Sequence, residues 1–327
     1  MSQGVSSAAE IKEAAKQIAQ LEQAVSKVIV GQQDVVRQVI LTLIAAGHGL
    51  IEGVPGVGKT LLAKALATAV GGKFSRVQFT PDLMPSDITG HLMYDVKTSE
   101  FEVRRGPVFC NFLLSDEINR APAKTQSALL EVMQEQQVTI EGTSYALAPP
   151  FIVLATENPI EQEGTYPLPE AQLDRFLLNI KIDYPQHDDE VAIVKQVTNA
   201  SKGDKLDVSQ IEQQLTPEQV IALQNIAAKL YVDEQIVQYA VNIVAATRNR
   251  NGIDVGAGPR GSIALLRAAR ANALMNGNEF VTPDDVKSVA SSVLRHRIRL
   301  NADLEIEGYP VDRVVADILR EVEAPRI

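Results

Sequence analysis

The chain of 327 residues is poor in cysteine and has no long apolar segment. Cys110 is the single cysteine, so an intrachain disulfide is excluded, and its position in an apolar run predicts a buried packing role. No stretch approaches the roughly 18 apolar residues of a membrane-spanning helix. The N-terminal segment has no basic stretch leading into an apolar one, so we expect no secretory signal. Together these absences favour a cytoplasmic protein.

Positive charge is also scarce, because 41 acidic residues outnumber 31 basic ones and give a formal charge of -10. This balance argues against a dedicated nucleic-acid surface. The four histidines lie far apart and lack the paired spacing of metal ligands. No repeat of fixed period and no low-complexity tract is present. The length and the 45% hydrophobic content are sufficient for a sizeable core and favour two domains.

What the chain does have is a glycine-rich loop between an apolar run at residues 48–52 and a helical pattern that follows it. Glycines let backbone amides curl around an anion, Lys59 supplies a mobile charge for the outer phosphates, and Thr60 offers a hydroxyl to Mg²⁺. The helix start adds unpaired amides and the positive end of the helix dipole. An ordinary strand-to-helix turn is the alternative. The predicted phosphate-binding residues are Gly53, Val54, Pro55, Gly56, Val57, Gly58, Lys59, Thr60 and Leu61.

Further apolar runs indicate the fold class. They lie at residues 74–79, 111–115, 151–156 and 176–182, and near-continuous apolar runs are typical of buried parallel strands. Their alternation with helical segments predicts an open α/β sheet with ligand groups at the carboxyl ends of the strands. Helical spacing predicts two helices ahead of the loop, at residues 11–30 and 35–46. Residues 90–105 and 137–148 alternate like short β-hairpins and interrupt this plan.

After Pro185 the pattern is typical of helices alone. Thr216 and Thr282 each stand before a proline and an acidic residue, which is the order of a helix cap and first turn. Helical spacing also covers residues 233–250, 259–276 and 311–322. We therefore expect an α/β nucleotide-binding core with its N-terminal helix at residues 1–185 and an all-helical lid domain at residues 186–327, with a hinge at residues 184–189.

Polar residues close two of the predicted strands. Asp116 and Glu117 end the apolar run at residues 111–115. Acidic residues often close strands, so the pair alone is a weak indicator. Downstream of a phosphate loop it predicts two tasks: Asp116 holds Mg²⁺ through its water shell, and Glu117 takes a proton from the attacking water or orients it. Asn158, after another buried run, suits the γ-phosphate or that water, although its spacing favours a simple Asn-Pro turn.

The order of glycine loop, Asp-Glu strand, strand ending in Asn and helical domain resembles that of the AAA+ ATPases over nearly the whole chain. Residues 116–122, 155–159 and 169–176 together look like the MoxR family. Magnesium-chelatase subunits and replicative minichromosome-maintenance helicases are relatives, and the predicted hairpins match inserts of that wider group. The resemblance implies a parallel sheet sandwiched by helices and followed by an all-α lid. It places Walker A in the glycine loop, Walker B at Asp116 and Glu117, and sensor 1 at Asn158.

Two arginines gain a role only from this resemblance. It implies that Arg175 is an arginine finger for the γ-phosphate bound by a neighbouring subunit, and that Arg260 is the sensor 2 arginine of the lid. The alternatives are a salt bridge between Arg175 and Asp174, and a solvated helix start at Arg260. Arg120 suits a subunit boundary or a structural pair. The basic cluster at residues 295–299 suits the charged end of a helix, or contact with acidic partners or nucleotide.

The resemblance implies a MoxR-type ATPase that hydrolyses ATP with Mg²⁺ in a homo-oligomeric ring, expected to be a hexamer. The expected catalytic residues are Lys59, Glu117, Asn158, Arg175 and Arg260. Family members remodel or mature client proteins like chaperones, often beside a protein with a von Willebrand factor A domain. One alternative is a motor subunit of a chelatase-like or helicase-like complex, and the acidic charge argues against the helicase. The other is an ATP-gated scaffold without turnover. The chain lacks a guanine-reading motif, which favours ATP.

Overall fold

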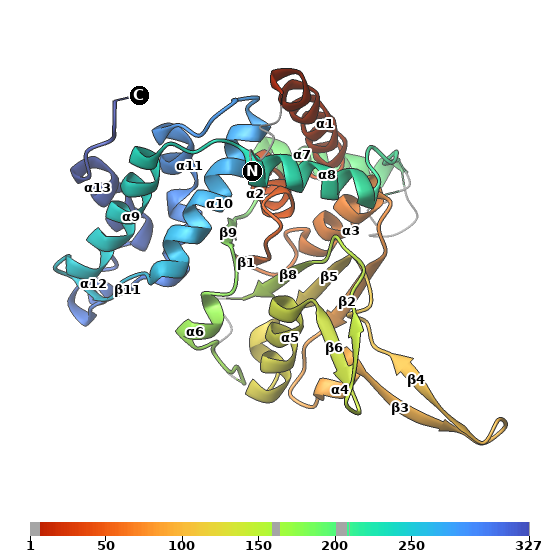
Figure 1. Cartoon of the computed structure of the whole chain (residues 1–327). Coiled ribbons are helices and arrows are strands. Elements are labelled where there is room, and N and C mark those ends of the chain that lie inside the picture. Colours follow the sequence, from red (N-terminus) through yellow and green to blue (C-terminus); the bar gives the residue numbers. More distant parts are fainter. Residues whose placement is uncertain (1–6, 159–163, 201–207, 209, 327) are drawn as a thin grey trace, which may run out of the picture.

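The computed structural model describes residues 7–158, 164–200, 208 and 210–326, and a parallel sheet lies at its centre (Figure 1). The sheet has five strands in the order β2-β5-β8-β1-β9, and every neighbouring pair is parallel. Each of these strands was predicted from its apolar run. Their bounds are β1 (Gly49–Gly53), β2 (Phe74–Gln78), β5 (Phe112–Asp116), β8 (Ile152–Glu157) and β9 (Leu178–Ile182).

The two faces of the sheet belong to different hydrophobic cores. In β5, Phe112 and Leu114 pack into one core and Leu113 into the other, because successive side chains of a strand point to opposite faces. The first core also contains α1 (Ala8–Ser26), α2 (Gln33–Ile44) and α3 (Lys59–Val70). The second contains α4 (Pro85–Thr89) and α5 (Ala123–Glu135), together with the predicted packing residue Cys110. The sheet is therefore covered on both sides, as expected for parallel strands.

Two antiparallel hairpins extend this core where the sequence predicts them. One joins β3 (Gly90–Asp95) to β4 (Glu100–Arg105) and projects from the body of the molecule (Figure 1). The other joins β6 (Gln137–Ile140) to β7 (Thr143–Ala146), and its Val138 and Ile140 are buried in the second core. The first hairpin is more exposed, because only Val103 packs partly against that core.

The C-terminal part is mainly helical. Its helices are α7 (His187–Ala200), α8 (Pro217–Lys229), α9 (Glu234–Asn249), α10 (Pro259–Met275), α11 (Pro283–Leu294), α12 (Ala302–Ile306) and α13 (Val311–Glu321). Thr216 and Thr282 both form capping boxes, which confirms the two predicted helix starts. The prediction of helices alone is wrong in one place, because β10 (Ile253–Val255) pairs with β11 (Arg299–Leu300). Strands this short show no readable period of two, so sequence reasoning missed them.

These helices dock directly on the α/β core. α8 and α10 share one continuous hydrophobic core with α1 and α2. Polar contacts reinforce the docking, because Arg267 donates to the carbonyls of Ala45 and Ala46 at 2.8 and 2.9 Å, beyond the end of α2. The boundary near residue 185 stays a prediction. Among the described helices, none is both long and apolar enough to cross a membrane.

Candidate nucleotide site

The glycine loop joins β1 to α3 and has two kinds of glycine. Gly56 and Gly58 both have a φ of +86°, a left-handed conformation that glycine adopts without strain, and nothing lies where their Cβ atoms would be. Gly53 is instead needed for close packing, because a Cβ there would overlap the side chain and carbonyl of Ile182 on β9. The loop is thus held against the sheet at one end, while its central backbone is open to a ligand.

The loop opens into a pocket of about 780 Å³ at the carboxyl ends of the strands. The pocket brings together Lys59, Thr60, Asp116, Glu117 and Asn158, which sequence reasoning placed in one site. Its full lining is Pro55, Gly56, Gly58, Lys59, Thr60, Leu61, Lys64, Arg76, Gln78, Asp116, Glu117, Thr156 and Asn158. Gly53 and Val54 do not line it, because Gly53 packs against β9 and Val54 against the first hydrophobic core.

The Lys59 side chain is held by two backbone carbonyls. Its amine donates to the carbonyl of Gly53 and, at 3.3 Å, to that of Glu157. Burial lowers the pKa of this amine, and three nearby carboxylates oppose the shift. Asn158 is 7% exposed and lines the same pocket from the end of β8. The pocket therefore holds a cationic group beside carboxylate and amide groups, with glycine backbone along one wall.

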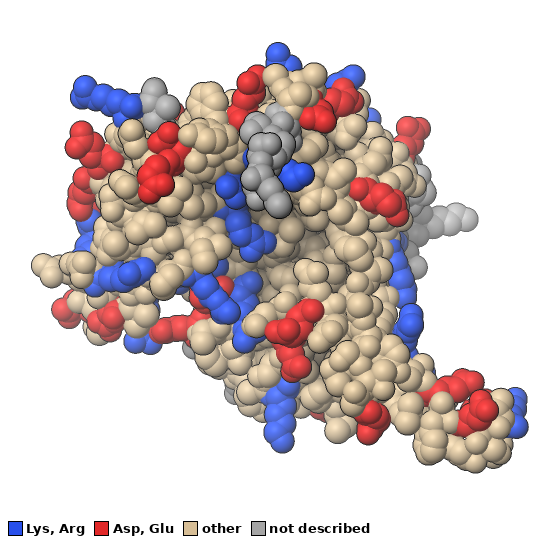
Figure 2. All heavy atoms as spheres, in the orientation of Figure 1, with Lys and Arg blue, Asp and Glu red and all other residues tan. Residues whose placement is uncertain are grey.

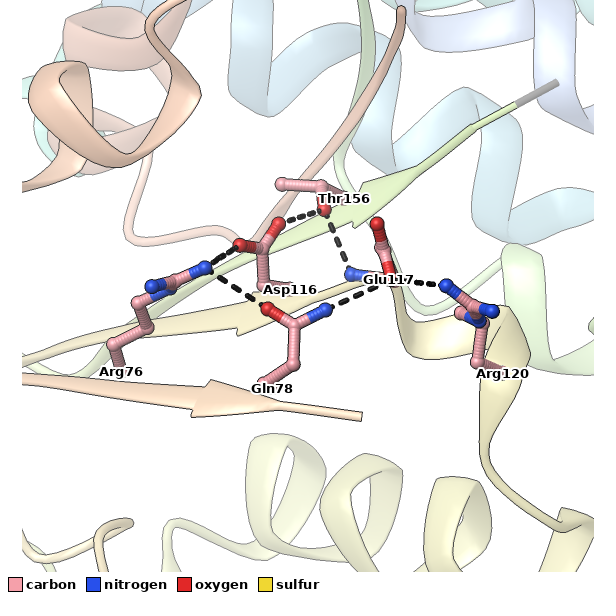
Figure 3. Close-up of polar contacts among 6 residues, drawn as sticks. All are labelled: Arg76, Gln78, Asp116, Glu117, Arg120 and Thr156. Atoms are coloured by element: carbon pink, nitrogen blue, oxygen red, sulfur yellow. Dashed lines mark hydrogen bonds and ion pairs between the residues drawn. The ribbon is translucent and has the colours of Figure 1, made fainter. Parts of the chain in front are cut away.

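The two carboxylates at the end of β5 have different partners (Figure 3). Asp116 accepts 2.6 Å hydrogen bonds from the Thr156 hydroxyl and from the Arg76 guanidinium. Glu117 accepts from Gln78 at 2.8 Å and from Arg120 at 3.1 Å. A structural pair was one of the two expectations for Arg120, and the structure shows that pair. Its place at a subunit boundary stays a prediction.

Glu117 also has an unusual backbone, with φ 55° and ψ 53°. A non-glycine residue in the left-handed region costs about 1 kcal/mol or more and persists only where its surroundings hold it. Here the Thr156 hydroxyl accepts the Glu117 amide at 2.9 Å and donates to Asp116, so one side chain fixes both acidic residues. Such strain is often found where a catalytic group is aimed at its substrate.

Sequence reasoning missed three residues of this network: Arg76, Gln78 and Thr156. Arg76 and Gln78 alternate on β2, which pairs with β5, and they are linked by a 2.9 Å hydrogen bond. Their signal was weak but present, since polar residues two apart near a strand's carboxyl end face the same side. The partner strand of β2 could not be identified without the sheet order.

A second, more apolar pocket of about 400 Å³ lies on the other side of the glycine loop. Its lining is Val28, Ile29, Val30, Gln32, Pro55, Gly56, Val57, Gly58, Leu61, Tyr184, Pro185, Glu190, Ile193 and Val194. The two pockets share the lining residues Pro55, Gly56, Gly58 and Leu61, so they lie side by side along the glycine loop. Sequence reasoning did not foresee the second pocket; the apolar run directly before Gly31-Gln32 was the available signal.

Arg175 and Arg260 do not line the loop pocket. Both line a separate cavity of about 370 Å³, together with Arg267 and Arg297. Figure 2 shows Lys and Arg side chains gathered between the helical part and the core on this face. Arg260 thus lies outside the loop pocket of its own chain, and its role as the sensor 2 arginine stays a prediction. Sequence reasoning could not foresee this, because α10 docks beyond the end of α2 and away from the loop.

The two arginines differ in their own contacts. Arg175 donates to the Leu130 carbonyl at 3.3 Å and to Gln134. The alternative of a salt bridge with Asp174 is wrong, because Asp174 pairs with Arg297 at 2.7 Å. Arg260 is exposed, and no hydrogen bond or ion pair joins it to any residue that the structure describes. Its guanidinium is thus available to an external anion.

The basic cluster at residues 295–299 directly follows the C-terminal end of α11, as one of its two interpretations expected, but its side chains also make tertiary contacts. Arg297 is 8% exposed, and Arg295 bonds the carbonyl of Asn179 at 3.2 Å. Among the histidines, His48 is buried and accepts from the Val153 amide at 3.0 Å, and burial lowers its pKa to about 4. No group of three metal-ligating side chains occurs in the described residues.

Comparisons with known proteins agree with this geometry. Residues 48–178 match the model of the ATPase family associated with various cellular activities (AAA), and residues 245–318 match the AAA lid domain. The uncharacterized protein YeaC of Bacillus subtilis is 44% identical over 92% of this chain and 92% of its own. Chaperone MoxR1 of Mycobacterium tuberculosis is 44% identical over 93% of this chain and 81% of its own.

A solved structure has the same fold. The crystal structure of a protein from Cytophaga hutchinsonii, described as a candidate ATPase, superposes with a TM-score of 0.89 at 41% identity. The match covers 97% of each chain, so it includes both the loop pocket and the helical part. The chain belongs to the MoxR family of AAA+ ATPases.

Proposed function

We propose that this chain hydrolyses ATP with Mg²⁺ at sites shared between neighbouring subunits of a ring. One observation carries the proposal: the loop pocket contains the phosphate-binding and acidic groups, whereas Arg175 and Arg260 line a different cavity. The loop pocket also contains Lys64 and, paired with Asp116, Arg76, but many phosphoryl-transfer enzymes use a further arginine finger to stabilise the transition-state charge. A second subunit can supply it.

Within one subunit, the residues present suit a magnesium nucleotide. The open backbone at Gly56 and Gly58 and the Lys59 amine suit the phosphates. Thr60 and Asp116 offer the hard oxygen ligands that Mg²⁺ prefers, and the bound ion would neutralise phosphate charge. The apolar pocket beside the loop suits the flat face of the base.

Hydrolysis needs a water that is held and deprotonated. Glu117 lines the loop pocket and is the proposed base. Gln78 and Arg120 both donate to its Oε2 atom, which leaves Oε1 to accept a proton from the water. Asn158 supplies an amide that orients the water or the γ-phosphate.

Arg175 and Arg260 complete the site of the neighbouring subunit in this proposal. Guanidinium groups stay charged and spread their donors over phosphate oxygens. Both residues line one cavity, and Arg260 has no partner among the described residues, so the two can bind one anionic group together. This assignment moves Arg260 from its own nucleotide to that of its neighbour.

The biological role that we propose is chaperone-like remodelling or maturation of client proteins by a hexameric ring. MoxR1, at 44% identity, is described as a chaperone, which supports this role. A protein with a von Willebrand factor A domain is the proposed partner.

Mixing two inactive variants tests the shared site. Glu117→Gln lacks the base and Arg175→Ala lacks the finger, so each ring alone should lose turnover, by about 10³-fold or more for the finger. In mixed rings, an Arg175→Ala subunit keeps its base and receives the finger of a Glu117→Gln neighbour. We expect phosphate release from the mixture to exceed the sum of the separate samples. An Arg175→Ala ring with full activity would refute the assignment.

A further inference from the structure

Arg297 lies against the short stretch of chain that carries Arg175. Its Nε donates to the Asp174 carboxylate at 2.7 Å, and its Nη2 donates to the carbonyl of Phe176 at 2.6 Å. Further bonds reach the carbonyls of Asp174 at 3.3 Å and Leu177 at 3.2 Å. One guanidinium therefore holds the backbone on both sides of Arg175, although it lies more than a hundred residues away in sequence.

Neighbouring basic residues add to this contact from the same part of the lid. His296 lies 3.1 Å from the Phe176 carbonyl and donates this bond, because a carbonyl oxygen only accepts; burial lowers the pKa of the ring well below the usual value. Arg299 binds Glu170 at 2.6 Å. Glu170 begins α6 (Glu170–Leu173), the short helix directly before Arg175. Three lid residues, Arg297, His296 and Arg299, therefore bind the segment at residues 170–177.

The side chain of Arg175, by contrast, has few anchors. Only its Nη1 atom donates to described residues, and its Nε is buried without a partner. A finger with so few side-chain contacts takes its position from its backbone. Arg297 binds that backbone from outside the α6 turn, whose own amide bonds also hold it, and its remaining donor reaches the Val293 carbonyl at the end of α11.

The contact depends on the shape of the guanidinium. Burial lowers the pKa of Arg297, and Asp174 opposes that shift. A buried charge is tolerated only when its donors are satisfied, and the planar fork reaches several carbonyls at once. A lysine ammonium is a single point and cannot span the carbonyls on both sides of Arg175.

We propose that Arg297 is a positioning residue for Arg175, through which the lid sets the reach of the finger towards the neighbouring subunit's nucleotide. This inference rests on the proposed trans role of Arg175. The lid then controls hydrolysis in the next subunit rather than in its own.

The direct test is Arg297→Lys, with Arg295→Lys as its matched control. Arg295 lies on the same turn but bonds Asp312 and the Asn179 carbonyl, away from Arg175. We expect kcat to fall about 10²-fold in Arg297→Lys, because misplacing a catalytic group by about 1 Å has an effect of this size. Nucleotide affinity and ring assembly should stay unchanged, and Arg295→Lys should keep most of its turnover.

Two combinations separate positioning from simple loss of folding. The double variant Arg175→Ala with Arg297→Lys should be no slower than Arg175→Ala alone, because both changes remove the same finger. Arg297→Lys subunits mixed with Glu117→Gln subunits should regain phosphate release, since the partner lends an intact finger. A merely unfolded Arg297→Lys subunit could not regain it, and absence of recovery would overturn the inference.

A milder variant changes Asp174, the acceptor in the contact with Arg297. Asp174→Asn keeps the side-chain acceptor but removes its charge, so we expect a smaller fall in kcat, rescued in the same mixture. Full turnover in Arg297→Lys while Arg175→Ala is inactive would overturn the positioning role and leave the finger intact. Full turnover in Arg175→Ala would instead overturn the proposed function on which it rests.

Discussion

Arg76 and Asp116 form an ion pair inside the loop pocket, with 2.6 Å between Nη2 and Oδ2 (Figure 3). Asp116 is also the carboxylate proposed to hold Mg²⁺. Its other oxygen is bound by the Thr156 hydroxyl at 2.6 Å. The guanidinium and the cation therefore compete for one carboxylate.

We expect Arg76→Gln to lower the Mg²⁺ concentration needed for half-maximal turnover. The Arg76 side chain is 46% exposed, so the pair is worth about 1 kcal/mol or less. Its loss corresponds to a shift of roughly fivefold at most. Titration of Mg²⁺ at saturating ATP measures this shift. Arg104→Gln, on the exposed hairpin, is the control, and an increased Mg²⁺ requirement in Arg76→Gln would contradict the competition.

Replacing Gly53 with alanine should lower thermal stability more than replacing Gly56 with alanine. Gly56→Ala creates backbone strain of about 1 kcal/mol in open space, because its φ is +86°. Gly53→Ala forces β1 and β9 apart, since the added Cβ overlaps Ile182. We therefore expect the melting temperature to fall further in Gly53→Ala. Equal falls would show that the close approach of the strands matters less than the structure indicates.

Glu157 should make stability depend on pH. Burial, and next the neighbouring carboxylate of Glu52, raise its pKa from 4.5 to about 7. The two residues lie opposite each other on β8 and β1, and the Lys59 amine bonds the Glu157 carbonyl. Because the folded-state pKa is the higher one, the contribution to stability is full below about pH 4.5 and is lost as pH rises through about 7.

Glu157→Gln should remove that loss. Relative to the parent chain, the variant should gain stability as pH rises from about 5 to 8, by up to roughly 3 kcal/mol. Thermal melts across this range measure the difference. Glu52→Gln removes the like charge and should move the parent's transition towards lower pH. A stability difference that is the same at every pH would count against this account.

Arg260 and Arg267 line one cavity but should have separable roles. Arg267 binds two carbonyls beyond the end of α2, so Arg267→Ala should lower stability by about 1 kcal/mol. Arg260 has no partner among the described residues, so Arg260→Ala should melt like the parent but lose turnover. Melting curves and phosphate release distinguish the two. A destabilised Arg260→Ala would indicate a structural role instead.

Local patterns predicted the strands of the central sheet, several helices and part of the loop pocket, but they missed β10, β11 and pocket residues such as Arg76. Apolar runs predicted the strands, and the Thr216 and Thr282 caps predicted two helix starts, because these signals depend on residues close in sequence. The meeting of Lys59, Asp116 and Asn158 also followed from sequence, since the carboxyl ends of parallel strands share one edge.

Contacts between distant segments could not be predicted in this way. The Arg76–Asp116 pair needs β2 beside β5, and the apolar pocket needs the segment before α2 to meet the start of α7. The cluster at residues 295–299 suited a helix end in sequence, but Arg297 binds residues more than a hundred positions away.

The sequence by itself indicated the α/β fold, the family and the glycine loop with its acidic pair, because these depend on local spacing and on the order of the motifs along the chain. Only the tertiary structure decided that Arg260 lies with Arg175 rather than with its own loop, and that Arg297 binds the segment around Arg175. The physical reason is that α10 and the turn after α11 are positioned by packing on the core. Buried carbonyls and carboxylates there need hydrogen-bond donors, and these donors come from residues distant in sequence, which no local pattern can specify.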